Sequence, residues 1–166
     1  YDLITGTLRM KDYVDMEGSG EDVTTITAAG TPDLFTGNWP RSTLLGADNA
    51  ELRFLTVRNT GGSVNAVAIY NRYTSPRLTH VTVLAANGSN DTLGVFNNGG
   101  SAKMSDMTII VTGTTSVEGV FIFRGASSAL TNVAISVSGS GAIGLKINFS
   151  SPIIRNSVIT SSNVGV

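Results

Sequence analysis

A group of acidic residues near the start of the sequence is the first candidate for chemistry. It contains Asp12, Asp15, Glu17, Glu21 and Asp22, and no other segment has so many carboxylates. Several carboxylate oxygens together can bind a hard cation such as calcium. Charged residues at the edge of a β-structure also discourage strand pairing, which needs no ligand. We favour this second interpretation and predict no metal and no cofactor, with calcium as the alternative.

The single histidine is the second candidate. His80 and Asp106 occupy equivalent places in successive copies of a sequence repeat, and a His–Asp pair can act as a general base. Phe54 one copy earlier and Asn132 and Asn156 in later copies belong to the same column. A column with two asparagines and one aspartate is typical of a turn ladder, in which side chains bond to the backbone and to one another. We therefore interpret the column as structural and assign no catalytic residue.

Aromatic residues form a third group. Tyr70, Phe96 and Phe123 align in successive copies of the same repeat. Tyr73 and the single tryptophan, Trp39, are further aromatic candidates. Aromatic rings offer large apolar faces on which saccharide rings can stack. We predict these five residues as ligand-binding candidates. The alternative for Tyr70, Phe96 and Phe123 is an interior stack at a corner, and the alternative for Trp39 is a local cover over the core.

A second ladder is predicted beside the aromatic column. Asn71 and Asn97 align in the repeat, and we expect Arg124 and Phe149 to follow them. Asparagine tolerates the left-handed backbone that a sharp corner requires. The sequence therefore predicts a partial asparagine ladder at a corner of the fold.

Apolar residues define this repeat, which has a spacing of about 26 and signals an array of stacked supersecondary units. One set of columns contains Leu52, Leu78, Met104, Leu130 and Ile154; Leu55, Val81, Met107 and Val133; and Val57, Val83, Ile109, Ile135 and Ile159. A second set contains Val67, Leu93, Val120 and Leu145, and Ile69, Val95, Ile122 and Ile147.

Within each repeat, apolar and polar residues alternate over short stretches, and this alternation is the periodicity of a β-strand. Turn-forming residues separate the stretches. Such a repeat fits a solenoid in which each coil adds one strand to each of several parallel sheets, about 4.8 Å from the last. We predict an all-β, right-handed, single-stranded parallel β-helix of about five to six coils. It forms one domain over residues 1–166, and residues 30–42 make a loop excursion from the repeat.

Composition excludes several classes of partner. Only 14% of the residues are charged, the net charge is −1, and no basic stripe is present, so a nucleic acid is not expected as a partner. No run of 18 apolar residues occurs, so no membrane span is expected. The chain has no cysteine, which excludes disulfides and thiolate metal sites.

With these residues in view, the chain resembles the right-handed parallel β-helix superfamily with the pectin-lyase-like fold. The resemblance rests on the segment 14–20 and on the repeat pattern of residues 76–83, and it covers roughly residues 7–163. Within that superfamily the chain is most similar to uncharacterised bacterial β-helix repeat proteins, through units such as residues 94–98. The superfamily includes polysaccharide lyases, glycoside hydrolases, esterases and adhesins, so the fold alone implies no activity.

We predict a non-catalytic structural or adhesive module of a secreted or cell-surface protein that binds polysaccharide. One alternative is a fragment of a polysaccharide lyase or glycoside hydrolase. It would use the early carboxylates with Arg9 or Lys11, or Asp106 with His80 and Arg77.

The other alternative is a subunit of a filament that self-associates end to end. Residues 163–166 resemble the start of another coil at 142–145, so we also expect that the sequence is a piece of a longer chain with open coil ends.

Overall fold

Short strands separated by turns make up the computed structural model, which describes residues 2–3, 7–29, 42–62 and 64–162. No helix occurs in these ranges. The strands are β1 (Asp2–Leu3), β2 (Leu8–Arg9), β3 (Met16–Glu17), β4 (Thr25–Ala28), β5 (Leu44–Leu45), β6 (Glu51–Asn59), β7 (Asn65–Arg72), β8 (Arg77–Ala86), β9 (Asp91–Asn98), β10 (Lys103–Thr112), β11 (Ser116–Phe123), β12 (Ala129–Ser138), β13 (Ile143–Asn148), β14 (Ile153–Arg155) and β15 (Val158–Ser162).

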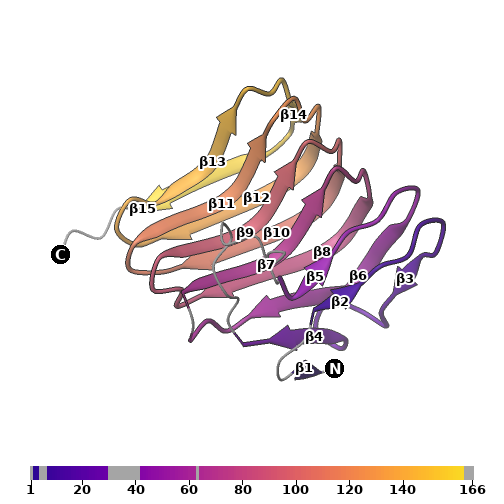
Figure 1. Ribbon diagram of the computed structural model, residues 1–166, viewed down its shortest axis with the longest axis horizontal. Coiled ribbons are helices and arrows are strands. Elements are labelled where there is room, and N and C mark those ends of the chain that lie inside the picture. The colour runs from indigo at the N-terminus through magenta and orange to yellow at the C-terminus, as the bar shows by residue number, and fades with distance from the viewer. Residues whose placement is uncertain (1, 4–6, 30–41, 63, 163–166) are drawn as a thin grey trace.

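The strands form two parallel sheets that face each other (Figure 1). A nine-stranded sheet has the order β1-β4-β6-β8-β10-β12-β14, with β3 beside β6 and β15 beside β12. A six-stranded sheet has the order β13-β11-β9-β7-β5-β2. The chain alternates between the two sheets, so each coil adds one layer to both. This is the all-β parallel solenoid that the sequence predicts, with about five turns.

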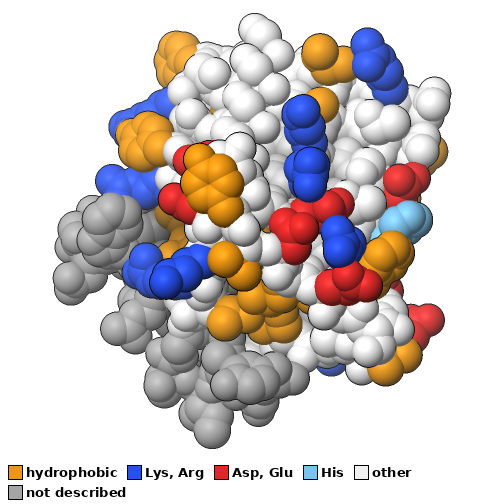
Figure 2. Space-filling view, turned by 90° about the vertical axis from the view of Figure 1, so that its right-hand side faces the viewer, with side chains coloured by type: hydrophobic (Ala, Val, Ile, Leu, Met, Phe, Trp, Pro, Cys, Tyr) orange, Lys and Arg blue, Asp and Glu red, His pale blue; other side chains and the backbone are white. Residues whose placement is uncertain are grey.

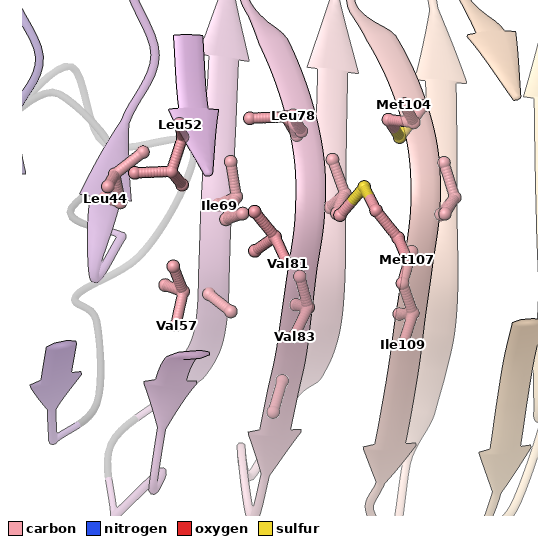
Figure 3. Packing of buried hydrophobic residues seen from close by; sticks show 14 of the residues in the cluster. Leu44, Leu52, Val57, Ile69, Leu78, Val81, Val83, Met104, Met107 and Ile109 are labelled. Atoms are coloured by element: carbon pink, nitrogen blue, oxygen red, sulfur yellow. The ribbon is translucent and has the colours of Figure 1, made fainter. Parts of the chain in front are cut away.

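The apolar columns fill the space between the sheets (Figure 3). Leu52 pairs with Leu78, and Val57 pairs with Val83, each across one full repeat. The next two coils continue the rows through Met104 and Leu130 and through Ile109 and Ile135. Every member of these two rows up to Ile135 is at most 2% exposed. Burying each such side chain contributes about 1.5–3 kcal/mol, so the repeat supplies the main stabilising term.

A sharp bend divides each long strand of the nine-stranded sheet. It occurs at a row of residues with positive φ between 49° and 55°, the left-handed region: Phe54, His80, Asp106, Asn132 and Asn156. The ladder pairs skip this position, since Arg53 pairs with Thr79 and Leu55 with Val81. The column that the sequence aligns is thus the corner of the solenoid.

The six-stranded sheet differs from the expected register in its third coil. Ile69 pairs with Val95 across a full repeat, but Val95 pairs with Val120, which comes one residue too early for a full repeat. We expected Ile122 in that place. The two registers differ by two residues, and because strand periodicity is two, both Phe121 and Phe123 lie on the outer face beside Phe96. The apolar pattern therefore cannot distinguish the two registers.

This shift changes the asparagine ladder. Asn71 and Asn97 pair as expected, but the next residue in their row is Ile122, not Arg124. Both asparagines are completely buried within strands and lack the left-handed backbone that we expected at a corner. Asn71 Nδ2 donates to Asn97 Oδ1 at 2.7 Å, and Asn97 Nδ2 donates to Ser128 Oγ at 3.2 Å. The ladder is a buried polar chain inside the apolar core.

The left-handed corner after the six-stranded sheet lies two residues further along. It is a row of residues with positive φ: Tyr73, Gly99, Arg124 and Phe149. The backbone N–H of Tyr73 donates to the carbonyl of Asn98, and that of Gly99 donates to the carbonyl of Phe123. Side chains at this corner project outward from the solenoid, and Tyr73 and Phe149 are 56% and 84% exposed.

Candidate functional site

The outer face of the six-stranded sheet carries an apolar cluster that is separate from the core. Its buried members are Val67, Tyr70, Leu93 and Phe96, and Phe121 and Phe123 pack against them. Tyr70 and Phe96 point outward because they follow Ile69 and Val95, which belong to the interior cluster, and successive strand residues point to opposite faces. Val67 and Leu93 depart from this alternation, since Ala68 and Ile69 both belong to the interior cluster. An apolar cluster on the outside of a sheet is not needed to build the solenoid.

Aromatic rings on this face form a continuous stack across the strands. Tyr70 and Phe96 have ring centroids 5.0 Å apart, and Phe96 and Phe121 are stacked at 4.9 Å with their planes 5° apart. Phe123 lies 5.6 Å from Phe121, and Phe149 lies 6.2 Å from Phe123. The spacing of rings on neighbouring strands follows from the distance between those strands, about 4.8 Å. Phe121 and Phe123 are instead two residues apart on the same strand, β11. We call these five residues together with Tyr73 the aromatic face.

Exposure increases along the aromatic face toward the C-terminal coils. Tyr70 and Phe96 are 3% and 7% exposed, Phe121 and Phe123 are half-buried, and Phe149 is 84% exposed. The part of this face that a ligand can reach therefore lies around Phe121, Phe123 and Phe149, with Tyr73 at the neighbouring corner.

Cationic side chains lie over three of the rings. Lys146 Nζ is 4.7 Å from the ring centroid of Phe121, and Arg124 Cζ is 5.0 Å from that of Phe123. Arg72 Cζ lies 5.6 Å from the centroid of Tyr73. These distances are within the range of cation–π attraction. The aromatic face thus combines apolar ring surfaces with N–H donors.

Lys146 is held in place by Glu118 on the neighbouring strand. The ammonium forms an ion pair and hydrogen bond with Glu118 Oε1, and the Glu118 side chain is only 5% exposed. A buried carboxylate needs such a partner, because an uncompensated buried charge is costly. Glu118 therefore fixes the ammonium of Lys146 beside the ring of Phe121.

Two polar contacts orient the tyrosines. Asn98 Nδ2 lies 3.2 Å from Tyr70 Oη, and Arg124 Nη1 lies 3.5 Å from Tyr73 Oη. Burial raises the pKa of the Tyr70 hydroxyl above its ordinary value, because the surrounding rings disfavour a phenolate. Tyr70 is thus a neutral, buried support for the face, whereas Tyr73 is exposed.

The early acidic group is spread along turns and carries specific bonds. Asp12 Oδ1 accepts the N–H of Asp48 at 2.9 Å, and Asp15 Oδ1 accepts the N–H of Glu51 at 2.8 Å. Glu21 folds over the nine-stranded sheet, where its carboxylate accepts the hydroxyl of Thr82. In the described part of the chain, no group of three or more histidines and carboxylates is arranged to hold a metal ion.

Arg53 neutralises most of the remaining charge in this region. Its guanidinium is 2.8 Å from Glu17 and 3.0 Å from Glu51, and Glu51 also bonds to Arg77 at 3.3 Å. The hydrogen bond with Glu17 raises the pKa of Arg53. Acidic and basic side chains lie beside one another across the middle of the face in Figure 2. This arrangement is a chain of ion pairs at the surface, with Glu51 as its most buried member, and pairs that solvent reaches are each of small energetic value.

The histidine column contains two separate pairs. The ring of His80 stacks on Phe54 with centroids 5.1 Å apart and planes 12° apart. Asn132 Nδ2 donates to Asp106 Oδ1 at 3.0 Å. These contacts are those of a ladder at the solenoid corner, and they leave the structural interpretation of the column unchanged.

The aromatic face only partly coincides with the residues that the sequence suggested. Tyr70 and Phe96 lie in one row, but Phe121 takes the third place in it, and Phe123 pairs with Asn98 two positions further along the strand. Trp39 lies outside the described residues. Phe121, Lys146 and Glu118 were not expected from the sequence. A repeat shortened by one residue places Phe121 beside Phe96.

No family model and no curated protein matches this sequence. Two solved structures are similar to it. One is the pectin methylesterase PemA from Erwinia chrysanthemi, with a TM-score of 0.65 and 18% sequence identity over 99% of this chain and 56% of that one. The other is a pectin methylesterase in complex with a hexasaccharide, with a TM-score of 0.58 and 17% identity over 99% of this chain and 58% of that one.

These likenesses show the fold. The chain is a right-handed parallel β-helix with the pectin-lyase-like architecture, as its repeat predicts. It spans somewhat more than half the length of each of the two pectin methylesterases. Among the described residues, no helix is long and apolar enough to cross a membrane.

Proposed function

We propose that this protein is a polysaccharide-binding β-helix module, and that the aromatic face binds the sugar chain. The observation that carries the proposal is the gathering of accessible rings and cations at one end of this face. Phe149 and Tyr73 are highly exposed, and Arg124 and Lys146 lie directly against neighbouring rings. A polymer that contacts several coils would gain affinity from many shallow contacts.

Pectin is the polysaccharide that we propose. Both similar structures are pectin methylesterases by name, and one holds a hexasaccharide. Pectin is a chain of galacturonic acid units, some of them methyl esters. Its carboxylates suit the guanidinium of Arg124, and its ring faces and ester methyls suit Phe121 and Phe149.

We propose binding without catalysis for the described part of the chain. Acid–base or nucleophilic attack on a polysaccharide needs a carboxylate or another base that is free to move a proton. Glu118, whose partner Lys146 lies over the Phe121 ring, is almost buried, and its carboxylate is bonded to that lysine. A binding role requires only the rings and the donors, and a secreted or cell-surface location would give it access to pectin.

Affinity electrophoresis in gels containing pectin tests the proposal. We expect the protein to be retarded by pectin and not by neutral dextran. The double substitution Tyr73→Ala, Phe149→Ala should weaken the retardation at least about fivefold, since stacked rings contribute about 1 kcal/mol or more to recognition. Phe54→Ala is the matched control, because Phe54 is an exposed aromatic residue with a left-handed backbone at the other corner.

Two results would contradict the proposal. Equal retardation of the double variant and the parent would show that the aromatic face does not bind pectin. Release of methanol or of unsaturated oligosaccharides from methylated pectin would replace the binding function with the enzymatic alternative. Far-UV circular dichroism of each variant checks that the fold is kept.

A further inference from the structure

A pocket lies on the nine-stranded sheet, away from the aromatic face. It is found where β6, β8 and β10 end and the chain turns toward the six-stranded sheet, and its volume is about 220 Å³. The residues that line it on three successive coils include Arg58, Thr60, Leu84, Asn87, Ile110 and Thr112.

The apolar part of the pocket comes from one outward row of the nine-stranded sheet. Arg58 pairs with Leu84, and Leu84 pairs with Ile110. Their chain neighbours Val57, Val83 and Ile109 point into the core, so alternation turns this row outward. Leu84 is half-buried, and Ile110 is 41% exposed. Two adjacent aliphatic residues at the surface are not needed for the core.

The polar side chains of the pocket differ in whether they have hydrogen-bond partners within the chain. Both polar atoms of the Asn59 side chain have partners within the chain, because its Nδ2 donates to the carbonyl of Val67 at 3.0 Å and its Oδ1 accepts the N–H of Gly61 at 3.0 Å. The Thr60 hydroxyl is directed to the carbonyl of Ala28 at 3.4 Å. The exposed Arg58 guanidinium forms no hydrogen bond or ion pair with any described residue. Arg58 is the charged residue of the lining, and its N–H donors are available to a ligand.

We propose that this pocket binds a small carboxylic acid with a branched aliphatic group. The carboxylate would bond to the guanidinium of Arg58, which presents two parallel N–H donors to such a group. The aliphatic part would cover Leu84 and Ile110 and remove their surface from water. Thr112 and Asn87 would lie at the polar rim.

The size of the pocket limits the ligand. Pockets for drug-sized molecules measure about 300–1,000 Å³, and this one is smaller. One cation and two aliphatic side chains match one carboxylate and one short branched chain.

The proposal is independent of pectin binding, because none of the lining residues belongs to the aromatic face.

Nuclear magnetic resonance titration of the ¹⁵N-labelled protein with 4-methylpentanoate tests the inference. We expect saturable shifts of the amide signals of residues 84–87 and 110–112, and little change at residues 121–124. The neutral analogue 4-methylpentan-1-ol, which lacks the carboxylate, and acetate, which lacks the branched chain, should each bind at least about fivefold more weakly.

Two surface variants make the test specific. Arg58→Gln should weaken binding of 4-methylpentanoate at least about fivefold and leave the alcohol unaffected, whereas Ile110→Thr should weaken both. Arg155→Gln, an exposed arginine on the last coil, is the control. No saturable shift at residues 84–87, or equal binding by the parent and Arg58→Gln, would overturn the proposal. Unchanged amide signals elsewhere in each variant show that it is folded.

Discussion

Tyr73 lies across Gly99, the equivalent residue one coil further along the solenoid. A Cβ atom built on Gly99 would come within 2.4 Å of Tyr73 Cδ1, which is closer than real Cβ atoms approach a neighbour. Both residues have a left-handed backbone, with φ of 53° and 79°. The absence of a side chain at residue 99 lets the Tyr73 ring reach over one coil to Arg124, whose Nη1 is 3.5 Å from the tyrosine oxygen.

This relationship predicts that Gly99→Ala displaces the Tyr73 ring and weakens binding to pectin. The left-handed backbone costs alanine about 1–2 kcal/mol, so the free energy of unfolding should fall by this amount or slightly more. Gly125→Ala separates the two effects. Gly125 has a similar φ of 75°, but its Cβ would meet no atom within 4 Å. We expect both variants to lose stability in urea and only Gly99→Ala to lose retardation by pectin. Equal retardation would show that the Tyr73 position does not matter.

The buried asparagine ladder predicts a large loss of stability from one substitution. Asn97→Leu removes both hydrogen bonds and leaves Asn71 Nδ2 and Ser128 Oγ without these partners inside the core. The free energy of unfolding should fall by about 2–4 kcal/mol in urea denaturation. The control is Asn148→Leu on the exposed surface of β13, which should change stability by less than about 0.5 kcal/mol. Similar values for both variants would mean that the ladder is energetically neutral.

The interior rows predict that a single charge prevents folding. Val95→Asp places a carboxylate in a completely buried position between Ile69 and Val120. Burying an unpaired charge costs more than the whole stability of most domains, so the variant should show no cooperative thermal transition. Thr108→Asp, on the exposed side of β10, should melt close to the parent. A folded Val95→Asp protein of equal stability would refute the assignment of this row to the core.

The raised pKa of Tyr70 predicts a dependence of stability on alkaline pH. The folded state favours the neutral hydroxyl, because burial disfavours the phenolate. The stabilising contribution is complete below the ordinary tyrosine pKa of about 10, and it is lost as the pH rises toward the higher pKa of the folded state. The urea midpoint should fall more steeply above about pH 10 for the parent than for Tyr70→Phe. Tyr13→Phe, whose hydroxyl is on a 79% exposed residue, should retain the slope of the parent.

Equivalent positions on the nine-stranded sheet could be aligned from the sequence because the step there is regular. Met104 and Leu130 stack one full repeat apart, as Leu52 and Leu78 do. The corner at His80 and Asp106 was also aligned correctly, since it lies inside the same regular strands. Because similar units stack on one another, the spacing found in one coil can be checked against the next coil, and errors in the alignment of equivalent positions do not accumulate in this sheet.

In the six-stranded sheet, equivalent positions could not be aligned from the repeat alone. Both Phe121 and Phe123 lie on the outer side of β11, and alternation alone allows either to follow Phe96. The turn before β11 is one residue shorter than the repeat implies, and its length is what sets the register. Lys146 and Glu118 come together only through this register, so their ion pair was not expected.

The sequence by itself determined the parallel β-helix, the interior rows of its nine-stranded sheet and the alignment of the corner row through His80 and Asp106, because these depend on side-chain periodicity that repeats in every coil. The tertiary structure decided which aromatic rings stack, which cations cover them and which arginine stays without a described partner. Those contacts join residues from different coils on the outer surface, where no packing requirement fixes the residue type. Their geometry follows from turn lengths and strand register, which periodicity does not encode.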